Sequence, residues 1–318
     1  MNTTELGKSN IFIPKIMMGT WQAGKQMWTG IEDNDSIEAL KTAYENGITA
    51  FDTAEMYGKG HSEKILGQAL KDVRKNIVIA TKAAPFNLTK DKIKNACHKS
   101  LKNIGTDYID LYQIHWPAGS FGSKKTPVEE TLDALNELKN EGKIRAIGVS
   151  NFSADQLKEA SDYTAIDSVQ PPYSILWRHA EKDILPLCKK KQITMLSYSP
   201  MAQGLLTGKF QKDHKFEKGD NRRSNKLFSG EAFEKSLAII KELKPVAADL
   251  DMSMANLALC WVISRDNTVA IAGARNAKQA ENNAKALNCR LPEEVIKLID
   301  SLSAGMAGLT GENPVMWD

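Results

Sequence analysis

The feature that most constrains the fold of this chain is a regular alternation of short apolar runs and helical stretches along its 318 residues. Each apolar run is rich in β-branched residues and ends at a polar residue or at glycine, and a stretch of helical periodicity follows it. Strands and helices that alternate in this way predict a parallel sheet, and eight such units can close into a barrel. The eight candidate strand ends are Thr20, Asp52, Lys82, His115, Ser150, Gln170, Ser199 and Gly273.

The helical stretches support the same architecture. They include residues 36–47, 90–105 and 127–142, and each of these closes with a glycine where a left-handed cap is expected. A doubly wound open sheet is the competing architecture, and it predicts the pattern GxGxxG after the first strand. Neither KIMMGTWQAG nor GKGHSE matches that pattern. We therefore expect an α/β fold, namely a (β/α)8 TIM barrel.

Segments outside the repeat predict additions to one barrel domain that spans residues 1–318. We expect residues 1–14 to form an N-terminal β-hairpin. Two further periodic stretches, 230–250 and 291–304, are expected to form extra helices. Residues 304–318 are expected to form an irregular C-terminal tail.

Residues 210–225 (FQKDHKFEKGDNRRSN) form a polar, aperiodic segment. Its length is typical of a functional loop, and such a loop can fold over a bound cofactor. We expect its two arginines, Arg222 and Arg223, to be solvated.

The composition excludes several classes of function. The chain has 42 basic and 39 acidic residues, a net charge of +3 and no basic block, which argues against nucleic-acid binding. It has no long apolar run and no secretory pattern at its start, MNTTELGKSN. We therefore expect no membrane span and a cytoplasmic location.

The four cysteines, Cys97, Cys188, Cys260 and Cys289, are far apart and form no CxxC pair. This spacing suggests neither a metal site nor a redox pair. We expect reduced thiols, with Cys260 as a small buried residue in the apolar helical run NLALCWVI.

Four chemically distinct side chains are expected to meet at the mouth of the barrel. Asp52, Lys82 and His115 end three consecutive strands, and Tyr57 lies in the glycine-rich loop after the first of them. The C-terminal ends of barrel strands share one mouth, so an acid, an ammonium, an imidazole and a phenol converge there. Taken singly, Asp52 is better explained as a turn residue and Lys82 as a solvated strand end. Their combination favours a functional site.

This set of side chains suits proton donation to a carbonyl oxygen. A phenol has an ordinary pKa of about 10, and we expect the ammonium of Lys82 to lower the pKa of Tyr57. Asp52 would keep Lys82 charged, and His115 would hydrogen-bond the substrate oxygen. No side chain supplies a hydride, so a reduction needs a nicotinamide cofactor.

Six motifs, in order and with natural spacing from about residue 3 to residue 290, resemble the aldo-keto reductase family. They are FDTAEMYGKGHSEKILG, IVIATK, DLYQIHWP, GVSNF, SYSPMAQGLLTGK and AIAGARNAKQAENN. The resemblance implies an α/β barrel enzyme that reduces aldehydes or ketones with NADPH. It implies Tyr57 as the general acid/base, Lys82 and Asp52 as the pair that tunes it, and His115 as the residue that orients the carbonyl.

The same resemblance implies a set of cofactor contacts. Ser150, Asn151 and Gln170 would hold the nicotinamide carboxamide, and Tyr198 would stack on the nicotinamide ring. The pyrophosphate would lie along Ser199, Pro200, Met201, Gly204, Leu205, Gly208 and Lys209. Arg275 and the start of the last barrel helix suit the adenosine 2′-phosphate. The residues implied at this adenosine end are Gly273, Ala274, Arg275, Gln279, Asn282 and Asn283.

Aromatic and apolar residues in loops after the strands are expected to form the substrate pocket. Trp21, Met56 and Trp116 are its predicted walls, and the predicted partner is a small-molecule aldehyde or ketone. For Trp28 and Trp177 the sequence leaves open whether they line the pocket or pack within loops, whereas Trp261 lies in a helix and is expected in the core.

Two other functions stay open on the sequence alone. One is a Schiff-base lyase on the same barrel with Lys82 as nucleophile. The other is an NADPH-binding regulatory or sensor subunit with little turnover.

Overall fold

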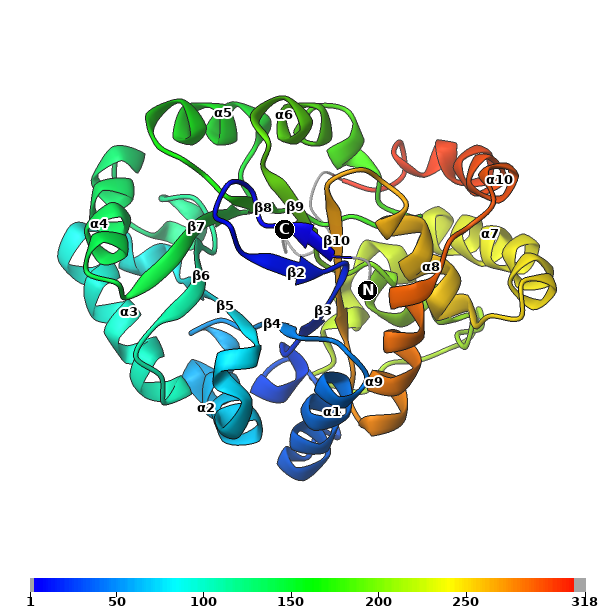
Figure 1. Ribbon diagram of the computed structural model, residues 1–318. Helices are drawn as coiled ribbons and strands as arrows, with labels where there is room; N and C mark the ends of the chain where they lie inside the picture. Colours follow the sequence, from blue (N-terminus) through cyan, green and yellow to red (C-terminus); the bar gives the residue numbers. More distant parts are fainter. Residues whose placement is uncertain (1–2, 312–318) are drawn as a thin grey trace.

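Eight parallel strands close into the barrel that the sequence predicts, in the order β10-β3-β4-β5-β6-β7-β8-β9 (Figure 1). The structure is a computed structural model that describes residues 3–311. An antiparallel hairpin, β1 with β2, precedes the barrel, as expected. The strands are β1 Thr3–Glu5, β2 Phe12–Pro14, β3 Ile16–Gly19, β4 Ala50–Asp52, β5 Val78–Ala83, β6 Ile109–Ile114, β7 Ile144–Ser150, β8 Ser168–Gln170, β9 Thr194–Ser197 and β10 Thr268–Gly273.

The helices form a ring around the outside of the barrel (Figure 1). Gly47, Gly105 and Gly142 follow three of them with left-handed backbone, as the sequence predicts. Both predicted extra helices are present, α7 before the seventh barrel helix and α10 after the eighth. The helices are α1 Asp33–Glu45, α2 His61–Leu70, α3 Lys90–Ile104, α4 Val128–Asn140, α5 Ala154–Tyr163, α6 Ile184–Lys191, α7 Gly230–Asp249, α8 Met254–Ile263, α9 Ala277–Ala284 and α10 Glu293–Ser303.

The predicted tail from residue 304 begins with a short 3-10 helix, Ala304–Met306, and residues 312–318 of it lie outside the described part of the chain. Within residues 3–311, no single helix combines the length and the apolar character needed to cross a membrane. Helices α7 and α8 reach that composition only when taken together, as a pair bent by 91°.

The period of two along each strand sorts the inward side chains into layers. Ala50 and Leu111 belong to an apolar cluster inside the barrel. Two residues further along the same strands, on the same face, come Asp52 and Gln113. Strand β5 repeats the pattern, with an alanine in the apolar cluster followed two residues later by Lys82. The barrel interior is therefore apolar towards its N-terminal end and polar towards its C-terminal end.

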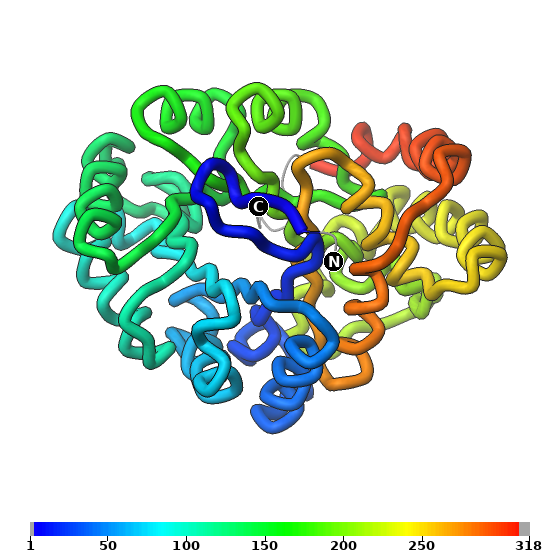
Figure 2. The backbone as a smooth tube through the Cα atoms, viewed as in Figure 1, coloured from blue at the N-terminus to red at the C-terminus, as the bar shows by residue number. Residues whose placement is uncertain are grey.

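The N-terminal hairpin closes the apolar end of the barrel. Leu6, Ile11 and Ile13 are buried in the same cluster as the inward residues of the strands. Figure 2 shows the backbone of this hairpin running across the barrel opening. Filling this end with apolar side chains leaves the C-terminal end of the barrel for a site.

One disulfide overturns the expectation that all four cysteines are reduced. Cys260 of α8, buried in its helix as predicted, is bonded to Cys289, which follows the 3-10 helix Lys285–Asn288. Their Cα atoms lie 5.8 Å apart, a separation that a disulfide can span. Strand β10 and helix α9 lie between the two residues in sequence, so their proximity arises from tertiary packing and no local spacing reveals it. Cys97 and Cys188 are buried free thiols.

Breaking this disulfide is expected to lower the free energy of unfolding by about 3 to 4 kcal/mol, because the crosslink restricts the unfolded chain over a loop of this length. Urea unfolding of the wild type and of Cys289→Ser, each with and without a dithiol reductant, measures this. The reductant should bring the wild type down to the stability of the variant and leave the variant unchanged. Alkylation of the unreduced, urea-unfolded wild type should label only Cys97 and Cys188, and labelling of Cys289 would contradict the assignment.

Candidate active site

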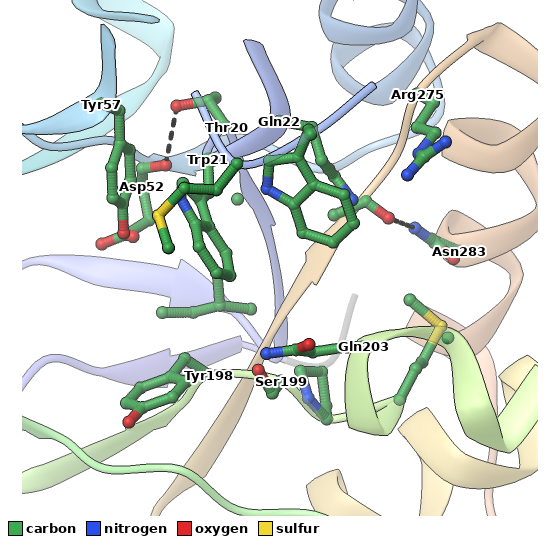
Figure 3. Close-up of a pocket in the computed structure, with 18 of the residues that line it drawn as sticks. Thr20, Trp21, Gln22, Asp52, Tyr57, Tyr198, Ser199, Gln203, Arg275 and Asn283 are labelled. Carbon is green, nitrogen blue, oxygen red and sulfur yellow. Dashed lines mark hydrogen bonds between the residues drawn. The ribbon is translucent and has the colours of Figure 1, made fainter. Parts of the chain in front are cut away.

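A pocket of about 960 Å³ opens at the C-terminal ends of the barrel strands. Seven of the eight strand ends marked in the sequence line it, and the eighth, Lys82, lies behind them. Figure 3 shows Asp52 and Tyr57 on one side of this pocket, Tyr198 and Ser199 facing them from below, and Arg275 further along. The strand ends therefore converge on one site, as the barrel architecture requires.

A buried ion pair, Asp52 with Lys82, lies at the base of the pocket. The Lys82 Nζ donates to Asp52 Oδ1 at 2.5 Å and to the Thr53 carbonyl oxygen at 2.7 Å. The side chain of Lys82 is fully buried and that of Asp52 is 4% exposed. Burial lowers the pKa of Lys82 and the Asp52 carboxylate opposes that shift. An ammonium in this position needs its carboxylate partner, because an unpaired buried charge is costly.

The other oxygen of Asp52 is held by two amides. Gln113 Nε2 donates to Asp52 Oδ2 at 3.3 Å and Gln170 Nε2 donates to it at 3.0 Å. Gln170 Nε2 also lies 3.2 Å from Gln113 Oε1. Gln113 has room only because residue 148 is glycine: a Cβ there would lie 2.9 Å from the Cγ of Gln113. Gln113 is not among the residues predicted from the sequence, although strand periodicity places it on the same face as the pocket residues.

Tyr57 and His115 face the pocket next to this ion pair. Their ring centroids lie 5.7 Å apart in an edge-to-face arrangement. The Lys82 Nζ lies 5.1 Å from the centroid of the Tyr57 ring. The four side chains predicted to converge therefore do so, with the phenol and imidazole towards the pocket and the ion pair behind them.

The pKa of Tyr57 departs from the expectation. Burial raises it well above the ordinary value, and the negative charge of Asp52 raises it further. The predicted lowering of this pKa by Lys82 is wrong for this arrangement, because the ammonium is paired with Asp52 and burial disfavours the charged phenolate. Burial also lowers the pKa of His115 well below its ordinary value, and the charge of Lys82 adds to that effect. At neutral pH the site thus holds a protonated phenol beside a neutral imidazole.

Residues at the ends of β7, β8 and β9 form a second polar group beside His115. Asn151 Nδ2 donates to the His115 carbonyl oxygen at 2.9 Å, and the Tyr198 hydroxyl donates to Asn151 Oδ1 at 2.9 Å. The Ser150 hydroxyl donates to the Gln170 carbonyl oxygen at 2.8 Å. The pocket is lined by all four residues of this polar group, Ser150, Asn151, Gln170 and Tyr198.

Basic side chains gather along the pocket away from Tyr57. Lys209, Arg222 and Arg275 line it, and Asp220 pairs with Arg222 at 2.5 Å. Burial lowers the pKa of Arg275 and of Lys209, and the charge of Arg222 lowers both further. These cations destabilise one another, and an anion between them would relieve that repulsion.

The expectation that Arg222 is solvated is wrong, whereas Arg223 is exposed as predicted. Arg222 is buried, with its guanidinium 5.2 Å from the Trp28 ring centroid and 4.8 Å from that of Phe216. Phe216 belongs to the same loop, whereas Trp28 is distant in the sequence and reaches this arginine only after folding, so the polarity of the loop misled the prediction.

The start of helix α9 borders the same end of the pocket. Asn276 caps the helix by accepting from the Gln279 N–H at 3.0 Å, and Gln279 Oε1 accepts from the Arg275 N–H at 3.0 Å. Asn283 Nδ2 donates to the Gly273 carbonyl oxygen at 3.1 Å, one of the contacts drawn in Figure 3. Asn282 bonds Asn256 of α8, which joins the two helices at this wall.

Most residues predicted for the cofactor and the substrate line this pocket, including Trp21, Met56, Trp116, Pro200, Met201 and Gly204. Trp28 lines it as well, which answers one question that the sequence left open. Leu205, Gly208 and Ala274 do not line it, and the Leu205 side chain is fully buried. Trp177 packs in the core, as does Trp261.

The residues present fit a dinucleotide cofactor by their chemistry. Arg275 Nη2 is buried and has no hydrogen-bond partner among the described residues, and the same holds for the indole Nε1 of Trp28. Four basic residues, Lys209, Arg222, Arg275 and Lys278, line this end, where Asp220 pairs with Arg222, and amide groups with a tyrosine ring stand at the other end. Phosphates suit the first set and a carboxamide-bearing ring suits the second.

Comparison with known proteins places these observations in a family. The Aldo/keto reductase family model matches residues 15–304. The chain is 34% identical to the NADH-specific methylglyoxal reductase of Escherichia coli, covering 96% of this chain and 99% of that one. It resembles the structure of a glycerol dehydrogenase from Gluconobacter oxydans with a TM-score of 0.86 and 31% identity, covering 100% and 99% of the two chains. An aldo/keto reductase from Klebsiella pneumoniae, in complex with NADP and acetate, gives a TM-score of 0.76 and 29% identity over 95% of each chain.

The lowered pKa of His115 predicts a loss of stability in acid. The folded protein resists protonation of this imidazole, whereas the unfolded chain does not. The free energy of unfolding is therefore unaffected above the unfolded pKa of about 6.5 and falls by up to about 1.4 kcal/mol per pH unit below it. Urea unfolding at successive pH values should show a shallower loss for His115→Gln than for the wild type. The control is His98→Gln, which removes an exposed imidazole; identical slopes for the two variants would contradict the prediction.

Proposed function

The chain belongs to the aldo/keto reductase family, and on that premise we propose that it reduces aldehydes and ketones to alcohols with NADPH, using Tyr57 as the general acid. The observation that carries this proposal is the position of Tyr57 and His115 on the pocket wall with the Asp52–Lys82 pair buried behind them. Family membership identifies an oxidoreductase acting on carbonyl groups. NADPH as the cofactor and the residue roles are our inference.

Tyr57 suits the role of proton donor to the carbonyl oxygen. Its raised pKa keeps the phenol protonated at neutral pH, so the proton is in place when substrate binds. A bound nicotinamide cofactor supplies the hydride that reduces the carbonyl carbon. Loss of the proton leaves a phenolate beside the Asp52–Lys82 pair, whose ammonium lies 5.1 Å from the ring centroid.

His115 suits the role of orienting the carbonyl. Its imidazole is neutral at neutral pH, and a neutral imidazole donates one hydrogen bond without adding a charge that would compete with Tyr57 for the proton. Asn151 bonds the His115 carbonyl oxygen and so fixes the backbone from which the ring projects.

The polar groups along the pocket suit the parts of the cofactor. Ser150, Asn151, Gln170 and Tyr198 would hold the nicotinamide end. The pyrophosphate would lie near Ser199–Lys209 and Arg222, and Arg275 would bind the adenosine 2′-phosphate at the start of α9. One relative is named NADH-specific. Our preference for NADPH rests on the four basic residues at this end, which exceed what a pyrophosphate alone requires.

The geometry disfavours the lyase alternative. The Lys82 Nζ is fully buried, donates to Asp52 and Thr53, and does not line the pocket. A Schiff-base lysine must reach the substrate carbonyl as a free amine. For the sensor subunit, no observation favours loss of turnover. A cytoplasmic location stays a prediction.

Tyr57→Phe is expected to lower kcat for carbonyl reduction by about a hundredfold or more, because the proton donor is lost. NADPH affinity, measured by fluorescence titration, should stay close to that of the wild type, since the hydroxyl acts only on the reacting oxygen. Tyr163→Phe, which removes an exposed phenol far along the chain, is the matched control and should keep full activity. Retention of activity in Tyr57→Phe would sink the assignment, and loss of cofactor binding would place Tyr57 in a different role.

Arg275→Ala is expected to raise the dissociation constant for NADPH by about tenfold to a hundredfold, because a charge-assisted contact to phosphate is removed. The dissociation constant for NADH should change far less. Arg223→Ala removes an exposed arginine of the neighbouring loop and serves as the control. Equal effects of Arg275→Ala on the two cofactors would mean that Arg275 does not read the 2′-phosphate.

A further inference from the structure

Exposed apolar side chains gather at the mouth of the pocket. Within residues 3–311, seven large apolar side chains are exposed, and four of them line this pocket. We call these four, Met27, Met56, Phe86 and Phe121, the apolar rim. Such a concentration in contact with water is unfavourable unless the side chains meet an apolar partner.

Phe121 is fixed in its position by its own turn. Its backbone has a φ of 54°, in the left-handed region that phenylalanine rarely adopts. The Gly119 N–H donates to Ser123 Oγ at 3.0 Å, and the Ser123 N–H donates to the Ser120 carbonyl oxygen at 3.0 Å. These bonds hold the turn, and the ring meets Trp116 edge-to-face at 5.1 Å. An aromatic side chain kept in a costly backbone conformation at a pocket mouth points to a contact with ligand.

Phe86 and Met56 are presented by a second fixed segment. Glu55 Oε1 accepts from the Ala84 N–H at 2.6 Å and from Asn87 Nδ2 at 2.9 Å. Phe86 lies between these two donors in sequence, and Met56 follows Glu55 directly. One carboxylate thus ties together the two loops that carry these rim residues.

Aromatic rings connect the reacting groups to the rim. The ring centroids of Trp21 and Tyr57 lie 6.3 Å apart. Trp116 follows His115 in the chain, and its ring contacts that of Phe121. In the part of the chain that the structure describes, no cation lies over the rings of Phe86, Trp116 or Phe121. The cations over aromatic rings of this pocket lie elsewhere, with Arg222 and Arg275 over Trp28 and Lys82 over Tyr57. The faces of the rim rings therefore offer apolar surface, and the lysine beside them, Lys92, donates to the Phe86 carbonyl oxygen at 3.5 Å.

We propose that the preferred substrate is an aldehyde that bears an extended, uncharged aryl group, with Phe86 and Phe121 as specificity-determining residues. This inference rests on the proposed carbonyl reduction. The aldehyde carbon gains a hydride from NADPH and its oxygen gains a proton from Tyr57, giving a primary alcohol and NADP+. The aryl group extends past Trp116 to the rim, where flat rings pack well against aromatic edges and faces.

The test compares three carbonyl compounds in kcat/KM. They are para-phenylbenzaldehyde, its analogue with a carboxylate on the distal ring, and methylglyoxal as a small probe. The wild type should prefer the uncharged biphenyl aldehyde over each of the others by about tenfold or more, as expected when one ring is taken out of water. Phe121→Ala and Phe86→Ala should each remove most of that preference while leaving kcat/KM for methylglyoxal nearly unchanged.

Phe12→Ala is the matched control, because Phe12 is also an exposed phenylalanine but lies on the hairpin at the closed end of the barrel. It should keep the preference of the wild type. Three outcomes would overturn the proposal. The wild type could show an equal or higher kcat/KM for methylglyoxal, or an equal kcat/KM for the aldehyde with the distal carboxylate. Both rim variants could also keep the preference of the wild type.

Binding of the product alcohol separates this proposal from the proposed function. Calorimetric titration of para-phenylbenzyl alcohol into the NADPH-loaded protein needs no turnover. If no carbonyl compound is reduced, the proposed function fails, and binding that weakens about tenfold in Phe121→Ala but not in Phe12→Ala still supports the apolar specificity of the rim. No detectable binding to the wild type would overturn it.

Discussion

The buried ion pair of Asp52 and Lys82 is the interaction on which the rest of the site depends. Removing both charges from water is costly, and the cost is offset only when every remaining donor and acceptor is satisfied. The Thr53 carbonyl oxygen accepts a second hydrogen bond from Lys82, and two glutamines donate to the other oxygen of Asp52. The inward polar layer is therefore a closed network drawn from several strands, and strand register is what assembles it.

This network also sets the chemistry of the groups in front of it. Because Lys82 is already paired, its charge does not draw a proton from Tyr57, and the Asp52 carboxylate raises the pKa of the phenol further. The same ammonium disfavours a positive charge on His115. Burial is the main reason that both neighbours remain neutral at physiological pH, one as a phenol that keeps its proton and the other as an imidazole that does not gain one, and the nearest charge adds to the effect in each case.

Much of this arrangement could be predicted from the sequence because it follows from periodicity. Apolar runs that end in polar residues predicted the strands, and consecutive strand ends predicted that Asp52, Lys82 and His115 meet. Gln113 was within reach of the same rule and was overlooked, since it lies inside an apolar run and not at its end. The disulfide of Cys260, the burial of Arg222 and the raised pKa of Tyr57 are different in kind. They depend on contacts between distant segments or on loss of water, and single-sequence patterns carry no record of either.

The two loops that carry Phe86 and Phe121 have a consequence for how such a barrel diverges. Each is held by bonds within its own turn or by the single carboxylate of Glu55, and these bonds do not involve the side chains of Asp52 and Lys82. Sequence changes there can accumulate without disturbing the inward layers that keep the strands together. Selectivity and fold are thus inherited as separable parts, and descendants of this chain can exchange one while conserving the other.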